Sequence, residues 1–229
     1  MKKLRLLISA CLFAAAAVVS SVAQRYYSPD FSIGIKGGAT LSQMSFMPTV
    51  RQKMTEGMTF GVMARYTEEK LFGLIAELNV TQRGWKEDYE EHPFSYSRRL
   101  TYIQLPLLTH IYFGSRHMKC FVNLGPEVGL MLHDRIKANF NYADVSSVPG
   151  YPANRRTEQL DMKIANRFDY GIAGGVGCEF FAHRRHSVML EGRFYYGLGN
   201  IFNATKADVF SASRGMSIEI TLGYFFRVI

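Results

Sequence analysis

Charged side chains occur at alternate positions in several segments that are otherwise small or apolar. Glu191 and Arg193 are two residues apart, and Glu219 has a similar setting in a later segment. In an extended strand, residues two apart point to the same face, so such side chains can meet. This spacing selects the following set: Lys36, Arg65, Glu77, Glu127, Glu179, Glu191, Arg193 and Glu219.

Acids and bases on one face permit two kinds of chemistry. Two carboxylates on neighbouring strands, such as Glu191 and Glu219, can exchange protons in general acid–base catalysis. Alternatively, the acids and bases pair with one another and fill an interior, because perturbed carboxylates also occur in purely structural networks. The sequence gives no sign of a substrate cleft and no Ser-His-acid spacing, which favours the structural network.

Histidine and cysteine are weaker candidates for chemistry. His183 and His186 have a metal-like spacing in a predicted turn, but a zinc site usually needs three or four protein ligands and no third ligand is near. Cys120 and Cys178 both fall on the apolar face of their segments, where a free thiol behaves as a small hydrophobic group. We therefore expect no metal site, no cofactor and no reactive thiol.

The elements that position these residues are predicted from a two-residue alternation, which is clearest near the C-terminus. Met216, Ile218, Ile220 and Leu222 share one face, and Glu219 lies on the other. Eight segments alternate in this way: 31–41, 57–67, 71–85, 98–113, 119–133, 167–181, 187–199 and 214–227. The pattern predicts an all-β fold, since no helical periodicity competes with it.

The connections between these segments alternate in length. Three are short, at 68–70, 114–118 and 182–186, and four are long, at 42–56, 86–97, 134–166 and 200–213. An antiparallel up-and-down meander with all its tight turns at one end is typical of an outer-membrane β-barrel. The sequence thus predicts an eight-stranded transmembrane β-barrel with short periplasmic turns and long extracellular loops.

A soluble lipocalin-like barrel would also alternate, but with its apolar face inward. Two observations favour the membrane barrel. The polar face is rich in glycine, which suits a narrow interior. The apolar face carries aromatic residues at the predicted periplasmic level, as in a membrane-interface girdle: Phe31, Tyr66, Phe72, Phe113, Phe180 and Phe226.

Residues 1–23 have the pattern of a cleaved signal peptide, with three bases, an apolar run and small residues before Gln24. A lipoprotein cleavage site at Cys11 is the alternative, but the apolar run continues past that cysteine. Residues 24–229 then form one outer-membrane β-barrel domain, with no apolar run near the roughly 20 residues that a membrane helix requires. The net charge of +8 includes the leader's bases, and no basic stripe indicates a nucleic-acid partner.

Five short segments resemble the PorT-like outer-membrane β-barrel family. They are residues 34–38, 102–108, 123–126, 168–175 and 191–198, which together extend over most of the predicted barrel. The resemblance implies an eight-stranded barrel in the outer membrane and implies little about activity. One branch of the family is associated with protein secretion.

Two prolines interrupt neighbouring predicted strands. Pro106 and Pro126 lie nearly opposite each other if the turn at 114–118 sets the register. A proline within a strand removes a hydrogen-bond donor and often marks a bulge. We therefore expect a β-bulge at this position.

Basic residues gather near the predicted extracellular ends of the strands and in the long loops. They are Arg98, Arg99, Arg155, Arg156, Lys206 and Arg214. We expect this rim to contact phosphates of the lipopolysaccharide layer through charge-assisted hydrogen bonds. Recognition of a protein or host ligand by the loops is the alternative.

These patterns together favour a monomeric, non-enzymatic barrel with a structural or surface-interaction role and a lumen filled by charged residues. An accessory role in outer-membrane protein secretion is the second hypothesis. A lipid A-modifying enzyme is the third, although parity places His110 inward, away from a lipid substrate. The expected partners are outer-membrane lipid and lipopolysaccharide, and possible protein partners are those of secretion or the cell surface.

Overall fold

The computed structural model describes residues 29–68, 71–90, 92–152, 154–183, 185–205 and 208–228. The predicted signal peptide lies outside these ranges. The elements in chain order are β1 (Asp30–Met47), β2 (Gln52–Lys53), β3 (Thr55–Thr67), β4 (Phe72–Glu87), β5 (Tyr96–Gly114), β6 (Met118–Ala138), η1 (Val145–Ser147), α2 (Glu158–Asp161), β7 (Phe168–His183), β8 (His186–Gly197) and β9 (Ala212–Arg227).

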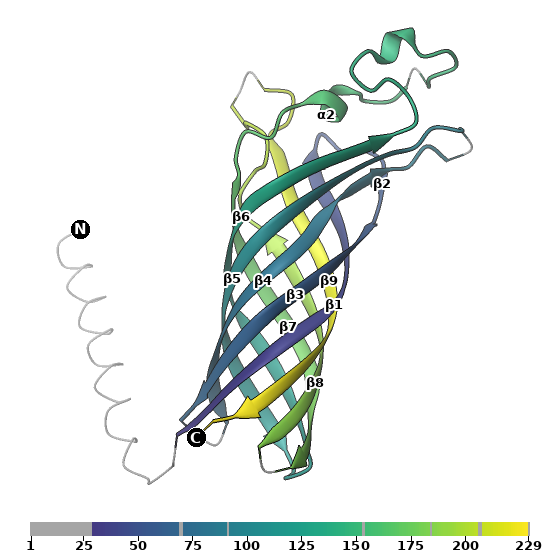
Figure 1. The fold of residues 1–229 in the computed structure, drawn as a ribbon. Helices are drawn as coiled ribbons and strands as arrows, with labels where there is room; N and C mark the ends of the chain where they lie inside the picture. The colour runs from purple at the N-terminus through teal and green to yellow at the C-terminus, as the bar shows by residue number, and fades with distance from the viewer. Residues whose placement is uncertain are drawn as a thin grey trace, which may run out of the picture.

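All the strands belong to one antiparallel sheet. Its order is β2-β4-β3-β1-β9-β8-β7-β6-β5, and β4 also pairs with β5. That extra pairing joins β5, the last strand in the order, to β4, the first long strand, so each of the eight long strands has two hydrogen-bonded long neighbours. Figure 1 shows these strands running obliquely around a cylinder. The eight predicted strands are thus confirmed, and β2 is a two-residue addition paired with β4.

The alternation of residue types sets which face of each strand points inward. In β9, Ile220 and Leu222 are 57% and 59% exposed, whereas Glu219 and Thr221 are buried. Apolar side chains on the other long strands are exposed in the same way, which gives the cylinder an oily exterior and a polar interior. The predicted girdle aromatics Tyr66 and Phe113 are among the exposed side chains.

The two ends of the cylinder differ. We call the end with the tight connections β3–β4, β5–β6 and β7–β8 the turn end, and the opposite end the loop end. The C-terminus lies at the turn end, beside the start of β1 (Figure 1). Several strands extend further toward the loop end than predicted, since β1 reaches Met47 and β6 reaches Ala138. The loops are correspondingly shorter, and the longest contains η1 and α2.

The predicted bulge at the prolines is wrong. Pro106 lies opposite Glu127, and the pairs Gln104–Gly129 and Thr109–Leu124 on either side keep one register. The missing N–H therefore interrupts the ladder without adding a residue to either strand. The shift between β5 and β6 occurs instead at Thr101 and Tyr102, closer to the loop end.

Candidate functional site

The eight charged residues predicted to point inward are all buried. The middle of the interior holds a cluster around Glu77. Lys36 Nζ lies 2.6 Å from Glu77 Oε2, and Arg193 reaches both Glu77 oxygens at 2.7 and 2.8 Å. Arg193 also lies 2.7 Å from Glu191 Oε2. One guanidinium therefore bridges two carboxylates, a charge-assisted arrangement with good geometry.

A second cluster lies around Arg83, which the sequence analysis missed. Its Nη2 is 2.6 Å from Glu127 and 3.2 Å from Glu219, and its guanidinium lies 3.8 Å from the centre of the Tyr195 ring. The Tyr195 hydroxyl donates to Asp169 at 2.9 Å. The signal was present, because Arg83 has the same parity as Glu77 in the predicted strand 71–85.

A third cluster lies nearer the turn end. Arg65 makes a bidentate ion pair with Glu179, with distances of 2.7 and 2.9 Å. His110 Nδ1 lies 2.7 Å from Asn123 Oδ1, and the Asn123 amide donates to Glu191 at 2.8 Å. The third cluster is thereby connected to the one around Glu77, and His110 is buried inside the cylinder as expected.

These contacts bear directly on the acid–base hypothesis. Glu191 pairs with Arg193, whereas Glu219 pairs with Arg83. In the β8–β9 register Glu219 lies opposite Arg193, not opposite Glu191. The two carboxylates are each held by a guanidinium, so their arrangement is that of a structural ion-pair network.

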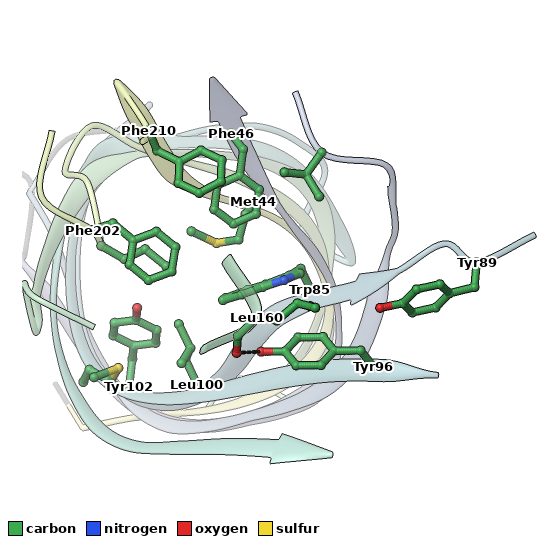
Figure 2. Packing of buried hydrophobic residues seen from close by; sticks show 13 residues of the cluster. Met44, Phe46, Trp85, Tyr89, Tyr96, Leu100, Tyr102, Leu160, Phe202 and Phe210 are labelled. Carbon is green, nitrogen blue, oxygen red and sulfur yellow. Dashed lines mark hydrogen bonds between the residues drawn. The ribbon is translucent and has the colours of Figure 1, made fainter. Parts of the chain in front are cut away.

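Above the charged layers, the loop end is closed by a hydrophobic plug that the sequence analysis did not foresee. It consists of Met44, Phe46, Val50, Trp85, Tyr89, Tyr96, Leu100, Tyr102, Met131, Leu160, Ile201, Phe202 and Phe210 (Figure 2). Phe46 and Trp85 pack edge to face with ring centres 5.4 Å apart, and Phe46 lies 5.2 Å from Phe210.

Two loops contribute side chains to this plug. The 139–167 connection contributes Leu160 from α2, whose carbonyl accepts a hydrogen bond from the Tyr96 hydroxyl at 2.8 Å. The 198–211 connection contributes Phe202 and Phe210, both fully buried. On the outer side, the Tyr89 and Tyr151 hydroxyls lie 3.3 Å apart, and burial raises the pKa of both groups. The loops thus fold into the cylinder and fill its mouth.

The six residues predicted to form a basic rim do not all lie at the surface. The predicted rim position of Arg98 is wrong, because its side chain is buried in the loop end. It pairs with Asp134 at 2.5 Å and donates to the Met162 carbonyl at 2.7 Å. Arg98 has the same parity as Leu100, and both side chains point inward from β5. Lys206 lies outside the described residues.

The remaining rim residues lie on or near the surface. Arg99 donates to the Glu56 carbonyl at 3.1 Å, and Arg214 is half-buried. Arg155 lies 4.7 Å from the Tyr89 ring centre, and Arg156 is exposed. Arg155 and Arg156 line a cavity of about 200 Å³. The other lining residues are Thr49, Val50, Arg51, Glu87 and Asn154. An anionic group is the ligand that suits such an arginine-rich cavity.

The turn end has a larger cavity, of about 660 Å³. Its basic lining residues are Arg65, Arg116, His117, Lys119, Arg185, His186 and Arg227. Arg227 pairs with Asp30 at 2.9 Å. The two ends therefore differ in character, since aromatic residues pack together at one end and basic residues line a cavity at the other.

Within the part of the chain that the structure describes, no three His, Cys, Asp or Glu side chains gather as metal ligands would. His186 Nδ1 instead contacts the Tyr224 hydroxyl at 2.5 Å. Over the same residues, no helix is long and apolar enough to span a membrane.

Comparisons with known proteins agree with this fold. The family described as outer membrane protein beta-barrel domain matches residues 22–203. The solved structure of OprG, an outer membrane protein from Pseudomonas aeruginosa, is 10% identical over 86% of this chain and 95% of its own, with a TM-score of 0.50. A search of curated proteins gave no match.

Two further solved structures are similar at lower TM-scores. Neisserial surface protein A is 11% identical, covers 87% of this chain and 99% of its own, and has a TM-score of 0.45. The attachment invasion locus protein Ail of Yersinia pestis is 12% identical, covers 85% and 98%, and has a TM-score of 0.40. At these identities the likeness concerns the fold alone.

Proposed function

Since the chain belongs to the outer membrane protein beta-barrel domain family and is located in the cell outer membrane, we propose that it is a sealed, non-enzymatic barrel with a structural or surface-interaction role. In this proposal the cylinder is a closed transmembrane barrel of eight strands. The turn end faces the periplasm, as tight turns do in such barrels, and the loop end faces the outside.

The observation that carries the proposal is the filled interior. An eight-stranded barrel is only just wide enough for its own side chains. Here the middle holds the ion pairs Arg193–Glu77 and Arg83–Glu127, and the loop end holds the hydrophobic plug defined above. A solute would have to separate both layers to cross, so a channel role is disfavoured.

Conductance measurements test the sealed lumen. We expect the purified protein to produce no stable current steps in a planar lipid bilayer, because buried ion pairs and a hydrophobic plug block the path of hydrated ions. A general porin in the same bilayer provides the positive control. Reproducible steps that scale with the amount of inserted protein would contradict the proposal.

The surface role rests on the arginine-rich cavity at the loop end. Arg51, Arg155 and Arg156 line it, and phosphates are anions that guanidinium groups bind well. We propose that this cavity binds phosphate groups of lipopolysaccharide. We also propose that the barrel is a monomer whose apolar exterior is covered by lipid. The PorT-like group is the finer family assignment that we propose, on the five segments given above.

Charge removal at the loop end tests this contact. The double variant Arg155→Ala/Arg156→Ala is expected to bind lipopolysaccharide about 30-fold more weakly in a neutral-lipid nanodisc, at about 1 kcal/mol per basic residue near an anionic surface. Binding is measured by titration at low ionic strength. Arg116→Ala/Arg185→Ala, which removes the same charge at the turn end, is the matched control. Equal binding by both double variants would refute the assignment.

A further inference from the structure

The two cysteines of the described chain lie directly opposite each other. Cys120 of β6 and Cys178 of β7 are register partners in the sheet. Their Sγ atoms are 3.0 Å apart, and both side chains are half-buried on the outward face. Parity alone predicts each thiol on the apolar face of its strand, and the β6–β7 register brings the two together.

The pair also lies close to the periplasm under the proposed orientation. Cys120 is two residues beyond the start of β6 and lies opposite Phe113, one of the girdle aromatics. Lys119 beside it lines the open cavity at the turn end. The thiols are therefore near the end of the barrel that a soluble periplasmic protein can reach.

The backbone geometry suits a covalent bond. Directly opposed residues of an antiparallel pair have Cα atoms about 4.5–5.5 Å apart. Disulfides are found at Cα separations of about 4.4–6.8 Å. The sulfur atoms need to approach by about 1 Å to reach the bonding distance of about 2.05 Å, which a small rotation of both side chains achieves.

The compartment supplies the driving force. A protein of the outer membrane passes through the periplasm, where disulfides form and persist. Two thiols held in contact there can form a disulfide more readily than two isolated thiols. Once an oxidant has reacted with the first thiol, the second can displace it and form the intramolecular bond. A pair of unoxidised cysteines facing lipid is the competing interpretation.

We propose that Cys120 and Cys178 form a cross-strand disulfide that fastens β6 to β7 near the turn end. The co-reactant is a periplasmic protein disulfide. The Cys120 thiolate attacks one of its sulfurs, forming a mixed disulfide and releasing one oxidant thiol. The Cys178 thiolate then attacks the Cys120 sulfur and releases the second. The cysteines lose two electrons and two protons, and the oxidant gains both as a dithiol.

The bond would close a loop that contains the longest connection between two strands. The two cysteines are 58 positions apart, and the segment between them includes most of β6, the 139–167 connection with α2, and more than half of β7. Closing so long a loop lowers the entropy of the unfolded chain more than closing a short one does. The clamp would thus favour β6–β7 pairing at the end opposite the plug.

Thiol counting on the full chain tests the proposal. Cells are quenched in acid, outer membranes are dissolved in SDS, and the protein is alkylated with N-ethylmaleimide, with or without prior reduction. Intact mass then reports the number of alkyl groups. We expect the reduced sample to carry two more groups than the unreduced one for most of the protein. This difference is independent of whether Cys11 is still present.

Single variants make the test specific. Cys120→Ser and Cys178→Ser each leave one thiol of the pair, which should be alkylated equally in both samples. Equal numbers of groups in the reduced and unreduced wild-type samples would overturn the disulfide. The proposal of a sealed barrel would stand in that case, because it rests on the interior and not on these thiols.

Discussion

An Arg193→Met variant is expected to lose a large part of the stability of the folded barrel. Arg193 neutralises two buried carboxylates, with contacts of 2.7 Å to Glu77 Oε1 and 2.7 Å to Glu191 Oε2. Methionine keeps much of the volume but no charge. Glu77 would still have Lys36, whereas Glu191 would keep, among its contacts with described residues, the hydrogen bond from Asn123. Breaking a buried pair from one side costs about 3–5 kcal/mol.

The measurement is the urea concentration at the midpoint of unfolding, for the protein refolded in detergent. The folded fraction at each urea concentration is read from the unboiled sample on a gel, where folded and unfolded protein migrate differently. Arg156→Met removes an arginine from an exposed site and should leave the midpoint nearly unchanged. Adding Glu191→Gln to Arg193→Met should restore part of the loss, since it removes the uncompensated charge. Identical midpoints for Arg193→Met and wild type would show that the network does not hold the interior together.

The strands and the lumenal charges could be predicted because both depend on local parity. In β9 a residue's position alone decides whether it meets lipid or the interior, and Glu219 and Ile220 fall as expected. Arg83 obeys the same rule and could have been found. Its partners Glu127 and Glu219 could not be assigned, because they come from strands far away in sequence, and side-chain reach decides which acid meets which base.

The loop end could not be predicted, since its packing is set by long-range contacts. Phe202 and Phe210 lie in a segment without periodicity, and nothing local says that they turn inward to Phe46. Arg98, by contrast, could have been placed inward. It is the first residue of the predicted strand 98–113 and has the same parity as Leu100, but its place on the rim was inferred from its charge and its nearness to the loop end.

An Ile220→Arg variant is expected to fold and insert poorly. Ile220 lies midway along β9, is 57% exposed, and is flanked by Ala39 of β1 and Gly192 of β8. On the proposed membrane orientation its side chain meets the centre of the bilayer. An arginine at the midplane of such a barrel costs about 2–4 kcal/mol, because the guanidinium loses its water and finds no partner among lipid tails.

The matched control is Met47→Arg, at the loop end of β1. Met47 is 62% exposed and pairs with Ala212 at the start of β9, so the same substitution there places the charge near the interface. Its cost should be about 0–1 kcal/mol. Folding into lipid vesicles, followed by protection from added protease, measures both variants against wild type. If Ile220→Arg is protected as fully as Met47→Arg, the oily face of β9 does not meet the bilayer core, and the inside and outside of the barrel would have to be reassigned.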